Sequence, residues 1–108
     1  MDLGTAVRGL RKAKRIKMKE LAAAAGISVT ALGYIEHSDC FPTKKTIDNL
    51  ARGLGVPVGC LLVFCVTEKD VPEEKREAFR CLAIPLKMLL LEAYAPEAVQ
   101  QMKDGNNG

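Results

Sequence analysis

The residues best suited to chemistry in this chain of 108 residues are basic side chains, and they are concentrated in its first half. Residues 1–57 carry ten Lys or Arg and five Asp or Glu, a net charge of +5, whereas the remainder carries six bases and eight acids. A basic half beside a mildly acidic one suggests a polyanionic partner for the first half. The alternative is a solvated, lysine-rich surface with no partner, and charge alone does not decide between them.

Metal binding and catalysis find little support in the sequence. The four cysteines (Cys40, Cys60, Cys65 and Cys81) form no CxxC pair, and the only histidine, His37, stands near Cys40 alone. That spacing is unlike the usual zinc patterns, and no paired carboxylates, Cys–His spacing or glycine-rich phosphate loop indicates an enzyme. We therefore expect no metal, no cofactor and no enzymatic activity, with reduced and mostly buried thiols.

The sequence also argues against a secreted or membrane-bound protein. Residues 1–19 contain no apolar segment of the kind found in a signal peptide. The longest uninterrupted apolar run, residues 56–66, is too short to cross a bilayer, which takes about 20 residues. We expect a cytoplasmic protein with an aliphatic core, because the chain has no Trp and only 5% aromatic residues.

Two helices are predicted at the start of the chain. The first, over residues 3–14, is indicated by the i, i+4, i+7 spacing of Leu3, Val7 and Leu10. The second, over residues 17–25, is favored by four consecutive alanines, which also leave a slim surface for another helix to approach. Gly26 then ends it, because a glycine just past a helix takes the left-handed conformation at little cost.

A third helix is expected directly afterwards, over residues 29–37. Ser28 is a good N-cap, because its hydroxyl can accept a free backbone N–H of that helix. The spacing predicts a buried stripe of Ala31, Leu32 and Ile35. The residues left facing outward are Val29, Thr30, Gly33 and Tyr34. Two short helices joined by a glycine-containing turn, the second partly exposed, are the plan of a helix-turn-helix, whose second helix enters the major groove of DNA.

The remaining elements complete an all-α fold. Thr43 is expected to cap a fourth helix that Gly55 ends, and Pro57 to begin a short fifth helix through residues 58–65. The C-terminal part is expected to contain, in order, a polar linker (67–70), a helix (72–84) that Pro85 kinks or interrupts, a leucine-rich helix (86–94), a short helix (96–103) and a frayed end (104–108).

Residues 3–62 resemble the phage repressor/Cro-type helix-turn-helix family, in order and with the family's spacings. The residues that carry the resemblance are Leu3-Gly4, Val7-Arg8, Leu10-Arg11, Met18-Lys19-Glu20-Leu21-Ala22, Gly26-Ile27-Ser28, Leu32, Tyr34-Ile35-Glu36, Pro42-Thr43, Ile47, Leu50-Ala51 and Leu54-Gly55-Val56. The resemblance implies a five-helix DNA-binding domain, usually a dimer on a two-fold operator. It also implies an ion pair between Arg11 and Glu36 that orients the third helix more than it adds net stability.

The resemblance assigns DNA-contacting roles to individual positions. The cap Ser28 is expected at the DNA, and base reading is expected from Val29, Thr30, Gly33 and Tyr34. Phosphate contacts are expected at the start of the second helix, from Lys17 and Met18. They are also expected at the loop before the fourth helix and at the start of that helix, from His37, Lys44 and Lys45.

Two departures from the family weaken these assignments. The family often has a DNA-contacting glutamine where Met18 stands, and methionine cannot donate that hydrogen bond. The third helix also lacks Arg, Asn and Gln, the usual bidentate base readers. Val29 and Thr30 can touch a thymine methyl group, and Thr30 and Tyr34 can form single hydrogen bonds. We therefore expect modest direct readout, with phosphate contacts and DNA shape carrying much of the affinity.

Residues 67–108 are predicted to form a helical extension beyond a DNA-binding domain of residues 1–66. Their apolar surface is too large for an isolated helix and must be covered. It can fold back on the domain or pair with a second copy, and we expect dimerization, because a dimer spans two half-sites. The predicted dimerization residues are Phe79, Leu82, Leu86, Leu89, Leu90 and Tyr94.

These observations predict a sequence-specific transcriptional regulator that acts on double-stranded DNA as a homodimeric repressor. The alternative is an antitoxin or protein-interaction adaptor on the same fold, whose C-terminal helices bind a protein partner and whose third helix reads DNA weakly or not at all. An enzyme is the least favored class.

Overall fold

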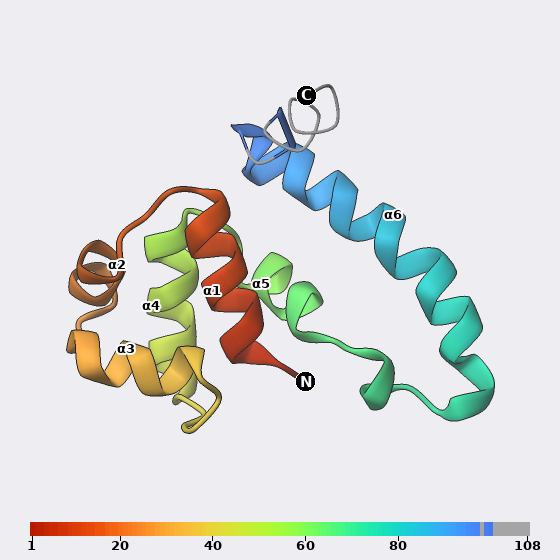
Figure 1. Cartoon of the computed structure of the whole chain (residues 1–108), viewed down its shortest axis with the longest axis horizontal. Helices are drawn as coiled ribbons and strands as arrows, with labels where there is room; N and C mark the ends of the chain where they lie inside the picture. Colours follow the sequence, from red (N-terminus) through yellow and green to blue (C-terminus); the bar gives the residue numbers. More distant parts are fainter. Residues whose placement is uncertain (98, 101–108) are drawn as a thin grey trace.

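The computed structural model describes residues 1–97, 99 and 100, and every regular element within them is helical (Figure 1). The elements are, in order, α1 (Leu3–Ala13), α2 (Met18–Ala25), α3 (Val29–Glu36), α4 (Lys44–Leu54), α5 (Val58–Cys65), two 3-10 turns (Glu68–Asp70 and Glu73–Lys75) and α6 (Arg76–Tyr94). The predicted all-α fold with a C-terminal helical extension is confirmed.

Short-range hydrogen bonds define the ends of the first four helices. Asp2, Ser28 and Thr43 each accept a hydrogen bond from the backbone N–H three residues later, at 3.0–3.3 Å, and so cap α1, α3 and α4. Gly26 and Gly55 end α2 and α4 with φ values of 71° and 73°. The predicted caps Ser28 and Thr43 and the predicted glycine stops are therefore present.

Helices α1–α5 pack around an aliphatic core. Each contributes a side chain with no exposed surface: Val7, Leu21, Leu32, Leu50 and Leu61. Helix α2 packs along α4, and α1 lies between α3 and α5 (Figure 1). Fully burying one such side chain stabilizes a fold by about 1.5–3 kcal/mol, so this cluster holds the five helices in one arrangement.

The sequence predicts that Pro85 kinks or interrupts the C-terminal helix, and the interruption is wrong, because a single α6 runs through Pro85 from Arg76 to Tyr94. Proline cannot donate the hydrogen bond to the carbonyl of Cys81, four residues earlier. Strong helix formers stand near Pro85 on both sides, among them Ala83 and Leu86, and the hydrogen bonds of the surrounding residues continue the helix across the gap.

The start of this helix also differs from the prediction. Residues 73–75 form a 3-10 turn, and α6 begins at Arg76 instead of residue 72. The predicted linker 67–70 is a further turn, in which Asp70 accepts a hydrogen bond from the backbone N–H of Thr67 at 2.8 Å. Arg76 donates to the carbonyls of Glu68 and Val71, so this segment is bonded to the start of α6.

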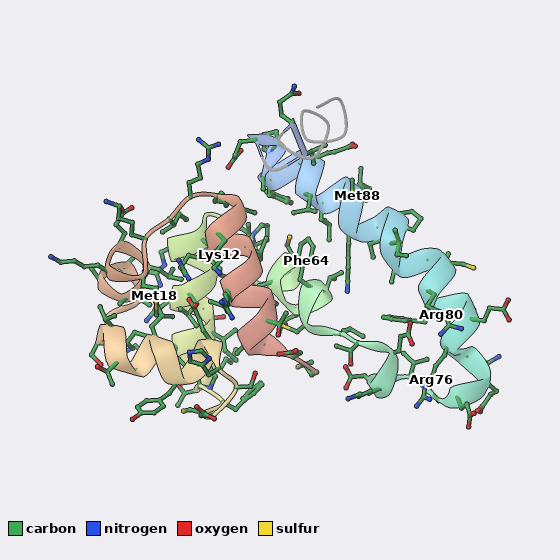
Figure 2. The ribbon with its side chains drawn as sticks, in the orientation of Figure 1. Lys12, Met18, Phe64, Arg76, Arg80 and Met88 are labelled. Carbon is green, nitrogen blue, oxygen red and sulfur yellow. The ribbon has the colours of Figure 1, made fainter. Side chains whose placement is uncertain are left out.

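The C-terminal half of helix α6 lies against the core. Leu90 and Leu91 are partly buried against the core, and Figure 2 shows Phe64 on the side of α5 that faces α6. Lys87 Nζ donates to the Val66 carbonyl at 3.3 Å. Residues 96, 97, 99 and 100 are helical, while the rest of the predicted helix 96–103 and the predicted frayed end 104–108 lie outside the described residues.

The four cysteines are free, but the expectation that most are buried is wrong. Cys60 and Cys65 are buried, whereas Cys40 and Cys81 are exposed. Cys40 lies in a loop between helices and Cys81 on a face of α6 that nothing covers, so neither meets a core. Burial raises the pKa of the Cys65 thiol to about 11, which makes it a poor nucleophile at neutral pH.

The length and hydropathy of the described helices limit which of them could cross a membrane. No single helix there is both long enough and apolar enough to cross a bilayer. Helices α4 and α5 reach that length and hydropathy only when taken together, and they are bent by 103° where they meet.

Candidate nucleic-acid interface

Helices α2 and α3 are joined by a tight turn at Gly26. The left-handed backbone there lets the Gly26 N–H reach the carbonyls of Ala22 and Ala23. The next residue, Ile27, donates to the Ala22 carbonyl at 3.0 Å and packs its side chain against the core. Ala22 itself is buried, so the small side chain lies where the helices approach one another. The predicted helix-turn-helix geometry is present.

A buried ion pair joins α1 to the end of α3. Arg11 Nε lies 2.8 Å from Glu36 Oε2, and Arg11 Nη2 lies 3.0 Å from Glu36 Oε1. The third guanidinium nitrogen donates to the Ile16 carbonyl at 3.1 Å. Arg11 is 9% exposed and Glu36 is 7% exposed, so water screens the pair little. Such a planar, two-bond contact orients α3 relative to α1 and to the loop before α2.

Close packing of α1 on α3 supports the ion pair. A Cβ atom on Gly4 would lie only 2.5 Å from the Ile35 carbonyl oxygen. Any side chain at this position would therefore push the two helices apart. The glycine lets α1 approach the end of α3, next to Glu36, closely enough for Arg11 to reach it.

The outward face of α3, defined here as Val29, Thr30, Gly33 and Tyr34, carries the predicted base-reading residues. Val29 is 45% exposed and Tyr34 is 57% exposed, and Thr30 is exposed as well. Gly33 is partly exposed, and a Cβ added there would meet no atom within 4 Å.

The opposite side of α3 packs on the core. Leu32 and Ile35 are buried as predicted. Ala31 is only partly buried, contrary to the predicted stripe, because it lies in the first turn beside the exposed cap Ser28. The helix has one charged residue, Glu36, and Arg11 neutralizes it, so the outward face carries no charge of its own.

The predicted phosphate-contacting lysines and His37 are all exposed. Lys17 is the N-cap residue of α2, while Lys44 and Lys45 are the first two residues of α4. His37 is exposed at the C-cap of α3. Helix N-termini present free backbone N–H groups, so the start of α2 and the start of α4 each combine such groups with lysine.

Met18 occupies a different environment from these exposed residues. Its side chain is partly buried and packs against the core at the start of α2 (Figure 2). The residue that stands where the family often has a glutamine thus contributes apolar packing. Its predicted DNA contact remains a prediction, limited to the exposed part of the side chain.

Phe41, in the loop between α3 and α4, has no role among the sequence-based predictions. Its ring is 64% exposed, and the loop that carries it is held by a hydrogen bond from the Asp39 N–H to the Tyr34 carbonyl. Ser38 in the same loop has a φ of 63° and donates from its hydroxyl to Asp2 at 3.3 Å. The sequence feature that could have drawn attention to Phe41 is a large aromatic residue in a polar loop, shortly before Lys44 and Lys45.

Comparison with protein families agrees with this geometry. Residues 2–62, more than half of the chain, match a family model described as a helix-turn-helix domain. The match includes α1–α4 and the first part of α5, and therefore the turn, the buried ion pair and every predicted DNA-contacting residue.

Similar proteins carry related descriptions. A protein named ImmF control region 10 kDa protein, from Bacillus phage phi105, is 35% identical over 72 residues, which are 67% of this chain and 77% of the phage protein. An uncharacterized HTH-type transcriptional regulator of Mycobacterium tuberculosis is 39% identical over 56 residues, 52% of this chain but 22% of that protein. The HTH-type transcriptional regulator SutR of Escherichia coli is 38% identical over 55 residues, 51% of this chain and 31% of SutR. The chain thus spans less than a third of either cellular relative.

Proposed function

The chain belongs to the helix-turn-helix domain family, and from this premise we propose that it is a transcriptional regulator that binds double-stranded DNA and acts as a homodimeric repressor. In this proposal α3 lies in the major groove, while the starts of α2 and α4 contact phosphates. The observation that carries it is the exposed outward face of α3, held in place by the buried Arg11–Glu36 pair.

Charge supports DNA as the partner. The excess of positive charge in residues 1–57 includes the exposed lysines Lys17, Lys44 and Lys45, which stand at or next to helix N-termini. Neutralizing a phosphate with a lysine releases condensed counterions, so each contact contributes to affinity and to its salt dependence.

An apolar stripe on α6 supports the homodimer. Leu82, Leu86 and Leu89 recur at i, i+4 and i+7, and all three are exposed. Beside the stripe, α5 and α6 enclose an apolar groove lined by Val63, Val66, Phe79, Leu82, Ala83, Leu86 and Lys87. Of the other predicted dimerization residues, Tyr94 is exposed, and Phe79 and Leu90 are partly buried. A second copy of α6 would cover the stripe and hold two α3 helices at the spacing of two half-sites.

An antitoxin or protein-interaction adaptor is the second candidate. The observation that favors it is the absence of charged and amide side chains from the outward face of α3. Under this candidate the stripe on α6 binds a different protein, and DNA affinity is low.

Fluorescence anisotropy of labeled duplex DNA at several salt concentrations tests the DNA-binding proposal. The double variant Lys44→Glu/Lys45→Glu should weaken binding and lower the slope of log K against log salt by about 2, since each phosphate contact contributes roughly 0.9. The matched control, Lys69→Glu/Lys75→Glu, reverses two exposed lysines between α5 and α6 and should leave the slope unchanged. Absence of binding at low salt would refute the proposal and favor the adaptor.

Sedimentation velocity at tens of micromolar protein tests the homodimer. The intact chain should sediment as a dimer, and Leu82→Lys/Leu89→Lys should sediment as a monomer. Ile84→Lys is the matched control, because Ile84 is also exposed on α6 but lies two residues from Leu82, on the other side of the helix. A monomeric intact chain would contradict this part of the proposal.

The repressor role is tested with a reporter gene. A promoter that contains the bound sequence should be less active when the protein is present. Increased transcription would identify an activator and would leave the DNA-binding proposal in place.

A further inference from the structure

The chemistry of the outward face of α3 narrows the kind of DNA sequence it can recognize. Bidentate hydrogen bonds to guanine or adenine require Arg, Lys, Asn or Gln, and the face has none of these. Its polar groups are the hydroxyls of Thr30 and Tyr34, and each can form single hydrogen bonds only. The face is therefore unable to read purines in the usual way.

Apolar groups make up most of what this face presents. Val29 exposes 45% of its surface in the first turn of α3, and Thr30 beside it adds a further methyl group. In the major groove, the apolar group on a natural base edge is the 5-methyl group of thymine, and 5-methylcytosine offers the same group. Burying a methyl group against a valine removes apolar surface of both groups from water and is therefore favorable.

Gly33 provides an independent observation at the same face. A glycine inside a helix destabilizes it relative to alanine. Packing does not require glycine here, because a Cβ would meet no atom of the protein within 4 Å. Gly4 and Gly53 differ, since a Cβ on either would lie less than 3.0 Å from a neighboring helix. Gly9 of α1 and Gly59 of α5 are open in the same way, so what distinguishes Gly33 is its place on the outward face of α3, where a bare backbone leaves room for a base edge to approach.

We propose that α3 recognizes the 5-methyl groups of pyrimidines in the major groove, with Val29 and Thr30 contacting a methyl group and Gly33 admitting the base edge close to the helix. This inference rests on the proposed DNA-binding function and specifies which DNA that function selects. Specificity then comes from thymine positions within each half-site, and the lysines at the helix N-termini supply sequence-independent affinity.

The experiment begins with selection of bound duplexes from a random pool by the full chain. In the selected duplex, each thymine is then replaced singly by deoxyuridine, which lacks only the 5-methyl group. Replacement at a contacted position should weaken binding about fourfold, the effect of one buried methyl-sized group. In a separate arm, a cytosine and a 5-methylcytosine are placed at the contacted position. Tighter binding of the methylated base would show that the methyl group itself is read.

Two exposed valines provide a matched pair of variants. Val29→Ala should lower affinity for the thymine duplex and remove the difference between thymine and deoxyuridine. Val58→Ala changes an exposed valine at the start of α5, far along the chain from α3, and should preserve that difference. Both valines are exposed, so neither change should prevent folding, and circular dichroism checks this.

Two glycines give the corresponding test of close approach. Gly33→Ala should raise the melting temperature by a few degrees, because the added Cβ enters open space and stiffens the helix. It should nevertheless weaken DNA binding by about tenfold or more. Gly9→Ala, at an exposed and equally open position on α1, should raise the melting temperature without changing DNA affinity.

The possible outcomes separate the inference from the function beneath it. The inference is overturned if salt-dependent binding is unaffected by deoxyuridine at every position, or if Gly33→Ala leaves the DNA affinity unchanged. Either result leaves the DNA-binding function standing. Selection that enriches no sequence, with binding still salt-dependent, overturns it as well. Absence of binding to any duplex at low salt overturns both.

Discussion

Helices α1–α5 and helix α6 use the same kinds of apolar side chain with opposite results. Leu50 of α4 has no exposed surface, whereas Leu82 of α6 is 73% exposed. The first five helices surround one another, so each apolar face meets several neighbors. Helix α6 contacts α5 and the two 3-10 turns before it. These neighbors are too small to cover a helix of 19 residues. The difference teaches that burial depends on the number of partners, since α6 is no poorer in leucine than α1–α5.

The ion pairs of the two regions differ in the same way. The Arg11–Glu36 pair within α1–α5 has side chains that are 11% and 4% exposed, whereas the Arg80–Glu68 pair beside α6 has side chains that are 53% and 47% exposed. Water screens the second pair and competes for its hydrogen bonds. Water cannot replace a lost partner in the buried Arg11–Glu36 pair, so removing either side chain leaves an uncompensated buried charge.

Removing one partner from each ion pair should give the largest difference between the regions. Glu36→Ala leaves the Arg11 charge buried and unpaired and should lower the free energy of unfolding by about 3–5 kcal/mol. Arg80→Ala should lower it by about 0–1 kcal/mol. Urea denaturation followed by circular dichroism measures both values. Equal losses would mean that the two pairs are equally screened, contrary to their exposure.

Truncating one leucine in each region should give the next largest difference. Leu50→Ala creates a cavity in the core and should cost about 2–5 kcal/mol. Leu82→Ala removes an exposed side chain and should cost at most about 0.5 kcal/mol in dilute protein. In the proposed homodimer the Leu82 loss should grow with protein concentration, because association stabilizes the folded state. A large, concentration-independent loss at Leu82 would indicate that this side chain is covered within one chain.

Replacing the proline inside α6 tests how far that helix is stable by itself. Pro85→Ala restores the hydrogen bond to the Cys81 carbonyl and should stabilize α6 by up to about 3 kcal/mol. Amide hydrogen exchange should show slower exchange across α6, with exchange in α2 and α4 unchanged. Slower exchange throughout α1–α5 would show instead that the two regions unfold together.

The smallest expected effect concerns the carboxylates that cap the two regions. Hydrogen bonds from Thr5 lower the pKa of Asp2 below its ordinary value, so the capping carboxylate contributes stability at neutral pH. That contribution is lost as the pH falls below about 4, through the lowered folded-state pKa. Asp2→Ala should therefore cost about 0.5–2 kcal/mol at pH 7, and the loss should shrink toward zero in acid.

Asp70 is the counterpart of Asp2 in the turn before α6. A hydrogen bond from the N-terminal amine lowers its pKa, but the carboxylate is exposed and caps only a three-residue turn. Asp70→Ala should change the free energy of unfolding less than Asp2→Ala does. Urea denaturation of both variants should be measured from about pH 3, roughly one unit below the ordinary Asp pKa, up to about pH 7. A larger loss of stability in Asp70→Ala than in Asp2→Ala would contradict the prediction.

Sequence reasoning was accurate where a residue acts on its near neighbors. The caps Ser28 and Thr43 and the stops Gly26 and Gly55 place the helix ends through bonds to residues three or four positions away. It was wrong to allow an interruption of the helix at Pro85 and to begin that helix at Pro72, because it gave too much weight to proline. It was also wrong about the exposed thiols, because an apolar stretch of sequence does not guarantee a neighbor in space.

By itself, the sequence determined the five helices, the turn between α2 and α3 and the family, since local hydrogen bonds and apolar spacing depend on adjacent residues. The resemblance implied that Arg11 pairs with Glu36, but only the tertiary structure decided that the two side chains, 25 positions apart, meet through two hydrogen bonds. It also decided that space is open at Gly33 and closed at Gly4, and that the stripe on α6 is uncovered. The physical reason is that burial and contact depend on which distant segments meet, and that is settled by the packing of the whole chain.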